Sequence, residues 1–271
     1  MQEPRFHDMS ERPGAAEEAW RPFVVAVGGL DPTGGAGLVR DFLTAEALGA
    51  RTVLVGTAWT RQDERGVKGV EPRSSDAVRA SLAEALAACP TGQTAVKIGM
   101  VAGASIVAAI VAGLDAWPGP VVFDPVLGAS ASGSLFAGTP ADLLPLLRRA
   151  TLVTPNLAES SWLTGLTVQN LDEVRQAAQE IAGRGLQAVL VKGGHLSGPA
   201  TDVLRSATGE RLYQGTRLPG RSPRGTGCAL ATAIAVGLAR GQSLEQAIDA
   251  AKVWLAGRIQ AAVAIGGARY L

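Results

Sequence analysis

A short segment around residue 225 combines two glycines, a cysteine and the start of an apolar run. It consists of Arg224, Gly225, Thr226, Gly227 and Cys228, and the Ala-rich stretch that follows is typical of a buried helix. Backbone N–H groups converge at the first turn of such a helix, whose partial positive charge favours a phosphate or a developing oxyanion. The same field lowers a thiol pKa from its usual ~8.5, which predicts a reactive Cys228. The alternative is a small buried cysteine without chemistry, the commoner fate of this residue.

Polar residues also follow several other apolar runs. Asp124 stands before Pro125, where it acts either as a turn or cap residue or as a carboxylate beside magnesium-bound phosphates. Asn156 and Glu159 have the spacing of a capping box, which is a strong alternative to a phosphate site at these two residues. Lys192 ends an apolar run in a chain that has lysine only at positions 68, 97, 192 and 252. An ammonium group there requires a partner, and a nucleotide phosphate would be one.

Three features carry weaker signals. Gln62 lies within 57–66, which we interpret as a loop, and its amide offers the donor and acceptor that complement an aminopyrimidine edge; a solvated glutamine is the alternative. For His195, the single histidine beyond the N-terminal segment, a polar loop role is favoured over a ligand contact. The glycine-rich segment 28–37 lacks the pattern of a P-loop or a dinucleotide fingerprint, so it indicates a tight turn as much as a binding site.

The composition restricts the function classes. The chain has 271 residues, 47% hydrophobic and 18% charged, and a net charge of +1 without a basic stripe, which argues against nucleic acid as the main partner. The longest apolar run, 101–114, is too short to span a bilayer. We interpret residues 1–20 as a disordered tail and not a signal peptide, and expect a cytoplasmic protein. Two cysteines without paired spacing argue against a disulfide framework or a zinc cluster.

The elements that must position these residues alternate along the chain. Short β-branched runs and longer amphipathic segments predict β-α units, hence a mostly parallel sheet with helices on both faces, in one domain over 21–271. The expected strands are 23–27, 52–57, 95–100, 121–124, 151–154 and 188–192, and the expected helices are 37–48, 75–88, 104–114, 140–149, 156–163, 171–184, 226–240 and 244–263. Segments 201–204 and 211–216 predict an antiparallel edge hairpin. Ligands of such sheets bind beyond the carboxyl ends of the strands.

The ordered set of motifs resembles the hydroxymethylpyrimidine and phosphomethylpyrimidine kinases of thiamine biosynthesis. The resemblance covers residues 23–267 and is carried by 29–37 with Asp41, Thr57 and Ala58 with Gln62, 97–100, 124–126, 154–159, 191–195 and 225–228. It implies a ribokinase-like, three-layer α/β/α fold. It also implies transfer of the γ-phosphoryl group of ATP, with Mg²⁺, to the hydroxymethylpyrimidine or its monophosphate.

The resemblance also assigns roles to individual residues. Those expected at the substrate are Gln62, Gly29, Asp41 and Met100; those at the nucleotide are Asp124, Asn156, Glu159, Lys192 and Thr226, with Asp124 and Glu159 as metal ligands; those at the oxyanion are Gly225 and Gly227. Cys228 stands where the sugar kinases of this fold have an aspartate base, and would take the proton from the attacking oxygen. A homodimer is likewise implied by the family.

Several residues depart from the family pattern. They are Trp59, Arg61, Asp63 and Glu64 around Gln62, Arg224 in place of a histidine, and Leu127 in place of a methionine. Pyridoxal kinase activity on the same scaffold is therefore the alternative function, and a non-catalytic ligand-binding relative is a third. A cysteine-nucleophile hydrolase would require a histidine signature that is missing around His195.

Overall fold

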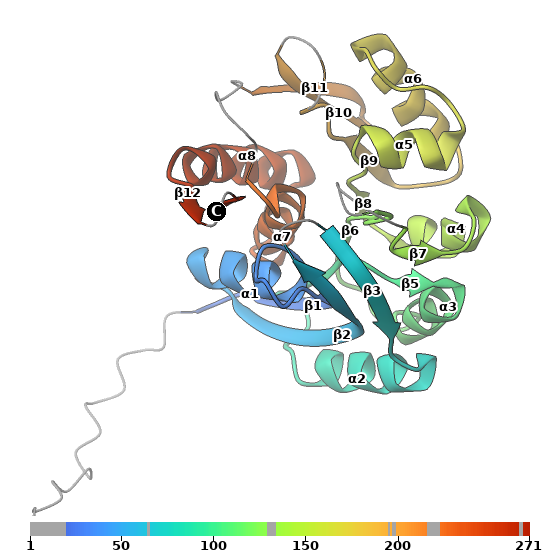
Figure 1. Cartoon of the computed structure of the whole chain (residues 1–271), viewed down its shortest axis with the longest axis vertical. Coiled ribbons are helices and arrows are strands. Elements are labelled where there is room, and N and C mark those ends of the chain that lie inside the picture. The colour runs from blue at the N-terminus through green and yellow to red at the C-terminus, as the bar shows by residue number, and fades with distance from the viewer. Residues whose placement is uncertain are drawn as a thin grey trace, which may run out of the picture.

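A nine-stranded sheet organises the computed structural model, which describes residues 20–63, 66–128, 134–194, 196, 199–215, 223–265 and 268–271. Its order is β11-β10-β9-β8-β6-β4-β1-β2-β3 (Figure 1). The strands are β1 (Phe23–Leu30), β2 (Arg51–Asp63), β3 (Gly66–Pro72), β4 (Thr94–Ile98), β6 (Val121–Phe123), β8 (Leu152–Val153), β9 (Ala188–Val191), β10 (Ala200–Ser206) and β11 (Gly209–Gly215). The six strands from β9 to β2 pair in parallel, whereas β3 and the β10–β11 hairpin are antiparallel at the two edges.

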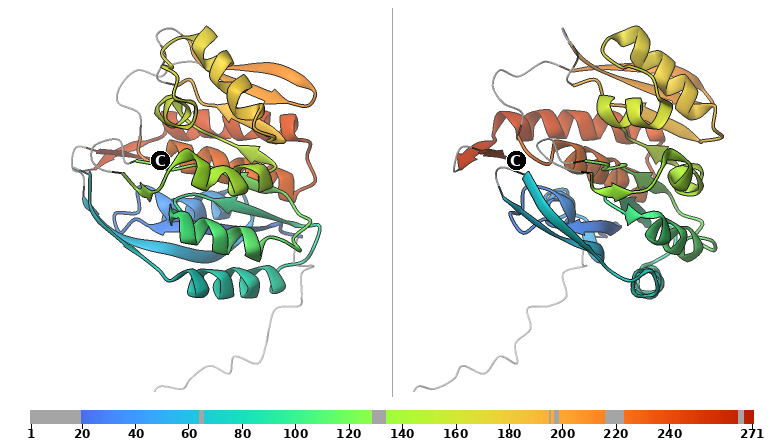
Figure 2. Two further views of the ribbon diagram at one scale, coloured as in Figure 1. Left: turned by 90° about the vertical axis from the view of Figure 1, so that its right-hand side faces the viewer. Right: turned by 45° about the vertical axis from the view of Figure 1, so that its right-hand side comes forward.

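Helices cover both faces of this sheet. They are α1 (Gly37–Ala47), α2 (Ser75–Ala87), α3 (Ala104–Gly113), α4 (Pro140–Arg149), α5 (Leu157–Thr164), α6 (Leu171–Ala182), α7 (Thr226–Ala239) and α8 (Leu244–Gln260). The first, seventh and eighth helices lie on one face and the second to sixth on the other, as Figures 1 and 2 show. The predicted three-layer α/β/α fold is therefore confirmed.

The alternation of side chains along the strands divides the core into two halves. Val24, Ala95, Val122 and Leu152 pack on the side of α7, and their chain neighbours Val25, Val96 and Val153 pack on the side of α2. Successive residues of a strand point to opposite faces, so a continuous apolar run supplies both cores. We call the face of the sheet that packs against α7 the α7 face. Helix α7 is buried nearly all round, which explains why small apolar residues dominate its sequence.

The structure differs from the sequence predictions mainly near the edges. The segment around Gln62, interpreted as a loop, is a strand: β2 continues to Asp63 and pairs with β3, which the sequence did not predict. Two short pairs were also missed, β5 (Ala102–Gly103) with β7 (Phe136–Ala137) and β12 (Val263–Ile265) with β13 (Ala268–Tyr270). Helix α8 accordingly ends at Gln260 and not at Val263. The predictions for His195 and for residues 1–19 lie outside the described residues.

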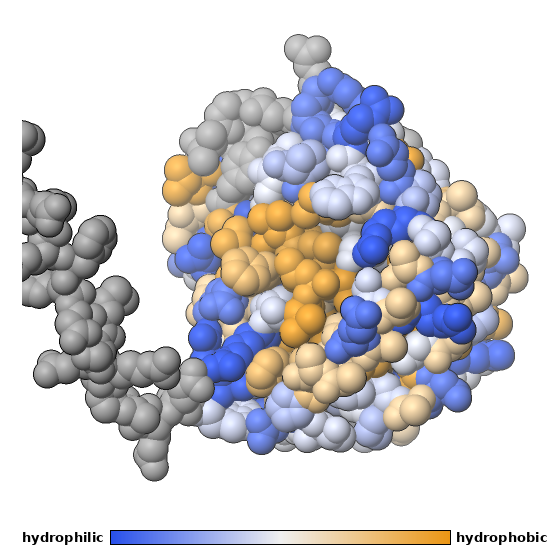
Figure 3. Space-filling view, turned by 90° about the horizontal axis from the view of Figure 1, so that it is seen from below, coloured by the Kyte–Doolittle hydropathy of each residue, from blue (hydrophilic) through white to orange (hydrophobic). Residues whose placement is uncertain are grey.

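One side of the molecule exposes large apolar side chains. Helix α1 contributes Phe42 and Leu43, and β2 contributes Leu54 and Trp59, each at least 40% exposed. Figure 3, which views the molecule from below, shows an extended apolar area on that side. None of the helices that the structure describes has both the length and the apolar character needed to cross a membrane.

Candidate active site

Four polar side chains at the ends of neighbouring strands point to the α7 face. Lys97 lies on β4, and Asp124, Thr154 and Lys192 directly follow β6, β8 and β9. Each lies two residues after a strand residue that packs in the α7-side core, so the alternation directs all four to the same face. Helix α7 packs against β1, β4 and β6 there, and its N-terminal turn therefore meets these groups.

The glycine turn before α7 brings the helix start to this cluster. Gly225 is the N-cap of the helix in the left-handed region, with φ of 77°, and a side chain there would collide with the carbonyl oxygen of Gly35. A Cβ on Gly227 would lie 3.2 Å from Lys192 Nζ and 3.6 Å from Asp124 Oδ2. The first turn of α7, whose N–H groups have no partner within the helix, thus lies beside the ammonium group of Lys192, whose side chain is 14% exposed. That combination suits the oxygen atoms of a phosphate.

Asp124 and Lys192 form a largely buried ion pair. Lys192 Nζ donates to Asp124 Oδ1 over 2.6 Å, and the hydroxyl of Thr154 donates to the same oxygen over 3.1 Å. Burial raises the pKa of Asp124, but the neighbouring ammonium groups of Lys192 and Lys97 offset this and hold it below the ordinary value. A carboxylate that is ionised at neutral pH therefore lies beside the helix start.

Asn156 and Glu159 form the capping box that the sequence left open. The Asn156 side chain accepts from the backbone N–H of Glu159 over 2.9 Å, and Glu159 Oε2 accepts from the N–H of Asn156 over 2.7 Å. Burial of the carboxyl raises the pKa of Glu159 to about 7, although Lys192 opposes the shift. Both residues therefore have a structural role at the start of α5, and Glu159 remains electrostatically linked to the Asp124–Lys192 pair.

The environment of Cys228 contradicts the expected low thiol pKa. The side chain is 8% exposed, and this burial raises the pKa of Cys228 to about 11 although Lys97 and the backbone N–H of Gly37 favour the thiolate. The helix start was expected to dominate, but loss of hydration outweighs it in this position. The thiol is therefore protonated at neutral pH in the unliganded protein.

A second ion pair, between Lys97 and Asp41, lies fully buried next to Cys228. Lys97 Nζ is 2.8 Å from both carboxylate oxygens of Asp41, and Thr232 Oγ1 donates to Oδ1 over 2.9 Å. Burial lowers the pKa of Lys97, but Asp41, Cys228 and Asp124 together raise it by more, so the lysine is charged. Asp41, expected at the substrate, thus has no exposed surface and binds Lys97. The rarity of lysine singled out Lys192 and could equally have singled out Lys97.

Two of the expected substrate residues, Gly29 on β1 and Met100 two residues after β4, lie side by side. A Cβ on Gly29 would lie 2.8 Å from Met100 Sδ, and the backbone oxygen of Met100 accepts from the hydroxyl of Thr57 over 2.7 Å. Met100 packs in a small apolar cluster with Ala58, Ala102 and Leu135. The structure therefore brings Gly29 and Met100 into contact beside an apolar wall.

Gln62 lies further along β2 and belongs to a polar chain. Its Nε2 donates to Thr60 Oγ1 over 3.1 Å, and its Oε1 accepts from Arg224 Nη2 over 3.4 Å. Arg224 directly precedes the glycine turn, so the end of β2 and the start of α7 are linked by side chains. Thr226, the first residue of α7, is half-buried at the same turn.

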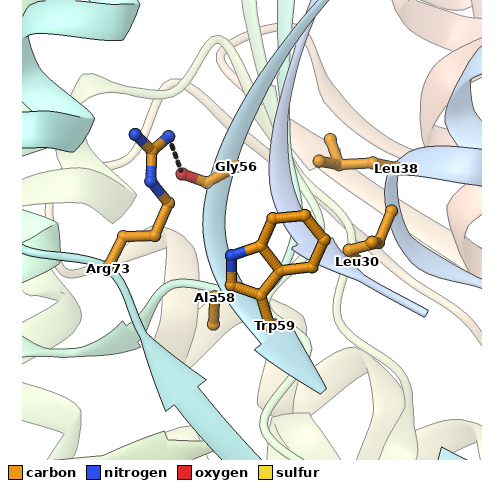
Figure 4. A pocket seen from close by; sticks show the side chains of 6 residues that line it. All are labelled: Leu30, Leu38, Gly56, Ala58, Trp59 and Arg73. Carbon is orange, nitrogen blue, oxygen red and sulfur yellow. Dashed lines mark hydrogen bonds between the residues drawn. The ribbon is translucent and has the colours of Figure 1, made fainter. Parts of the chain in front are cut away.

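A pocket of about 180 Å³ lies elsewhere on β2. Figure 4 shows Leu30 and Leu38 near Trp59, and Arg73 Nη1 donating to the carbonyl of Gly56 over 3.3 Å. None of the residues that the sequence predicted for the site lines this pocket. We therefore do not assign it to the substrate.

Comparisons with known proteins agree with this geometry. The model of the phosphomethylpyrimidine kinase family matches residues 31–270. A hydroxymethylpyrimidine/phosphomethylpyrimidine kinase of Streptomyces coelicolor is 40% identical over 251 residues, 91% of each chain. The crystal structure of phosphomethylpyrimidine kinase from Clostridium difficile matches with a TM-score of 0.76 and 30% identity, over 88% of this chain and 100% of that one.

A pyridoxal kinase is also similar. The enzyme of Staphylococcus aureus in complex with AMP-PCP and pyridoxal matches with a TM-score of 0.82 and 25% identity, over 93% of both chains. The sequence match over most of the chain decides the family, since the pyridoxal kinase shares fewer identical residues. This chain belongs to the phosphomethylpyrimidine kinase family and has its ribokinase-like fold.

Proposed function

We propose that the protein is a kinase that transfers the γ-phosphoryl group of ATP to hydroxymethylpyrimidine and to its monophosphate in thiamine biosynthesis. Membership of the family supports the activity. The observation that carries the proposal is that Gly227, in the turn at the start of α7, lies next to the Asp124–Lys192 pair at the carboxyl ends of the strands. Phosphoryl transfer requires mainly in-line positioning and charge stabilisation, which such a turn can supply.

In this proposal, Lys192, Thr226 and the glycine turn bind the phosphates of the nucleotide. The N–H groups of Gly225 and Gly227 bind the oxygens of the transferred group, and Lys192 neutralises their charge. The Thr226 hydroxyl, half-buried at the first position of α7, binds a phosphate oxygen. Asn156 orients the start of α5 through its capping hydrogen bond and contacts the nucleotide from there.

Asp124 and Glu159 fit a magnesium ion. Hard carboxylate oxygens are the protein ligands that Mg²⁺ prefers, and Mg²⁺ commonly uses one or two of them together with phosphate and water. Asp124 Oδ1 is occupied by Lys192 and Thr154, whereas Oδ2 faces the helix start. Bound with ATP, the ion would neutralise charge that develops on the phosphate oxygens.

Cys228 is the proton acceptor for the attacking oxygen in this proposal. Because the thiol pKa is about 11, only the small thiolate fraction does this work. Phosphoryl transfer has a loose transition state, so weak activation of the nucleophile is sufficient. Gly29 and Met100 line the pyrimidine, and Gln62 binds its aminopyrimidine edge. Asp41 fixes Lys97 next to the thiol instead of contacting substrate.

A coupled ATP assay with hydroxymethylpyrimidine, its monophosphate and pyridoxal tests the function. We expect turnover of both pyrimidines, loss of that turnover in Cys228→Ala, and a stronger effect of Gln62→Ala on the pyrimidines than on pyridoxal. Turnover of pyridoxal alone would favour the alternative, which the similarity to a pyridoxal kinase in complex with pyridoxal supports. No ATP turnover with any of these substrates would indicate a non-catalytic relative.

We further propose that residues 21–271 form one catalytic domain of a cytoplasmic homodimer. The two free, buried cysteines suit a reducing compartment. The exposed apolar side chains of α1 and β2 suit burial against a second copy. Light scattering after size-exclusion chromatography measures the assembly. A monomer at micromolar concentration would contradict the dimer.

A further inference from the structure

A chain of hydrogen bonds with one fixed direction runs from Arg224 through Gln62 to β1. Arg224 Nη2 donates to Gln62 Oε1 over 3.4 Å, Gln62 Nε2 donates to Thr60 Oγ1 over 3.1 Å, and Thr60 Oγ1 donates to the carbonyl oxygen of Leu30 over 2.8 Å. Thr60 is only 9% exposed, so its hydroxyl has few competing partners.

The chemistry of the two ends determines which way the Gln62 amide faces. A guanidinium group only donates hydrogen bonds, so the atom of Gln62 beside Arg224 must be the oxygen. The single hydroxyl hydrogen of Thr60 is directed to Leu30, so the atom beside Thr60 must be the nitrogen. Rotating the amide by half a turn would place the Gln62 amide nitrogen against the Arg224 guanidinium, so that two donors face each other. It would also place the Gln62 oxygen beside Thr60 Oγ1 with no hydrogen between the two oxygens. Both ends therefore select the same orientation.

We propose that Arg224 and Thr60 are positioning residues that fix the Gln62 amide in the orientation that recognises an aminopyrimidine. The inference rests on the proposed function, in which Gln62 binds that edge. Each amide atom keeps one further hydrogen-bonding position, an N–H on one side and a lone pair on the other. An aminopyrimidine offers a ring nitrogen and an amino group in one order only. A fixed amide therefore binds this edge without losing rotational freedom on binding.

Other contacts hold the Arg224 side chain at this position. Nη2 lies 3.6 Å from Asp31 Oδ2, and Nη1 donates to the backbone oxygen of Asp63 over 3.3 Å. Asp31 is 2% exposed, and its other carboxylate oxygen accepts from the N–H and the hydroxyl of Thr33. The backbone N–H of Arg224 donates to the carbonyl of Arg269 over 3.0 Å. The Arg224 guanidinium thus contacts the loop after β1 and the end of β2, and the Arg224 backbone is hydrogen-bonded to β13.

The position of Arg224 in the chain adds a connection to the reaction. The residue directly precedes Gly225, the N-cap of α7, so its backbone belongs to the turn that receives the phosphoryl group in the proposed function. Its side chain reaches the residue that binds the substrate ring. Arg224 therefore sets the position of the pyrimidine relative to the glycine turn, and a misplaced ring would lower the rate as well as the affinity.

Steady-state kinetics of matched variants test the inference. Arg224→Met keeps an aliphatic side chain without donors, Arg224→Lys restores a donor, and Thr60→Val keeps the shape of threonine without its hydroxyl. Arg148→Met is the control, because Arg148 also donates to a backbone carbonyl but lies on α4, away from the site. We expect Arg224→Met and Thr60→Val to raise the KM for hydroxymethylpyrimidine about tenfold, with partial recovery in Arg224→Lys. The KM for ATP and the melting temperature should stay close to those of the control.

A double-mutant cycle with Gln62→Ala separates positioning from a general structural effect. If Arg224 acts through the amide, adding Arg224→Met to Gln62→Ala changes kcat/KM for the pyrimidine less than threefold. Additive losses, or an equal rise in both KM values, would overturn the inference while leaving the proposed function intact. Absence of pyrimidine turnover in the unaltered enzyme would refute the proposed function and this inference with it.

Discussion

Replacing Lys97 by methionine tests whether the buried ion pair beside Cys228 is needed for stability. Methionine has a similar length and is apolar, so it fills the space of the lysine while removing its charge. The variant leaves the Asp41 carboxylate fully buried with only the Thr232 hydroxyl as a described hydrogen-bond partner. Breaking a buried ion pair in this way costs about 3–5 kcal/mol of unfolding free energy. For a chain of this length that loss corresponds to a melting temperature about 10 °C lower.

The double variant Lys97→Met with Asp41→Leu separates the charge effect from packing. It removes both charges and leaves only the Thr232 hydroxyl without its acceptor, at a cost of about 1–2 kcal/mol. We therefore expect the double variant to be more stable than Lys97→Met alone, because apolar residues often replace a buried pair without loss. Urea unfolding at pH 7, followed by circular dichroism, measures both free energies. The pKa of Lys97 is raised by Asp41 and its other acidic neighbours, and burial raises the pKa of Asp41, so the pair is lost in strongly alkaline solution, where Lys97 releases its proton, and in acid, where Asp41 gains one.

An exposed ion pair is the matched control for this experiment. Arg211 Nη2 lies 2.8 Å from Asp249 Oδ2, but both side chains are nearly half exposed, at 48% and 49%. Asp249→Asn should cost less than about 0.5 kcal/mol, because water and salt screen such pairs. A loss below about 1 kcal/mol in Lys97→Met, or a double variant no more stable than the single one, would refute the reasoning.

Three further predictions concern the helix start. Lys192→Met should lower kcat at least a hundredfold by removing charge from the transferred phosphoryl group, and a near-normal kcat in steady-state assays would contradict its role. The rate at which iodoacetamide alkylates Cys228, measured by peptide mass spectrometry, should rise tenfold per pH unit from pH 7 to about 10. A pKa of about 11 leaves about one thiol in a thousand ionised at pH 8. A plateau of the rate near pH 8.5 would contradict the effect of burial. Gly227→Ala adds a methyl group 3.2 Å from Lys192 Nζ and should reduce kcat/KM more than tenfold with little change in melting temperature; unchanged kinetics would show that the phosphate does not approach this turn.

The periodicity of the sequence predicted the central elements because their residues have one dominant environment. Strands such as β4 and β9 are buried on both faces and read as continuous apolar runs, and the amphipathic helices begin and end close to the expected residues. The segment around Gln62 was misjudged for the opposite reason. Its charged residues and glycines resemble a loop, whereas residues 60–63 extend β2 beyond its pairing with β1 and pair with β3, the edge strand. Strands at a sheet edge carry charged residues because water contacts them, so their composition is difficult to distinguish from that of a loop.

The pKa of Cys228 could not be predicted from its neighbours in the chain. The helix start and the glycines are local features, and both favour a thiolate. The opposing factor is burial by segments far away in sequence, including the start of α1, where the N–H of Gly37 hydrogen-bonds the thiol but offsets only part of the effect of burial. Loss of hydration depends on the whole fold, so the sequence gives the sign of the local field but not the net shift.

The arrangement of the site follows from the alternation of side chains along each strand and from the order of the strands in the sheet. Lys97, Asp124 and Lys192 each come two residues after an apolar residue that packs on the α7 face. Because side chains alternate along a strand, those apolar residues predict that all three polar side chains point to the same face. Which partner each lysine finds cannot be read in this way. Lys192 meets Asp124 across β8, which lies between β9 and β6, whereas Lys97 meets Asp41 because α1 packs on the same face over β1 and β2, next to α7. The two lysines then have different roles because they differ in access: the Lys192 side chain is 14% exposed and a phosphate can reach it, whereas Lys97 and Asp41 are 1% and 0% exposed.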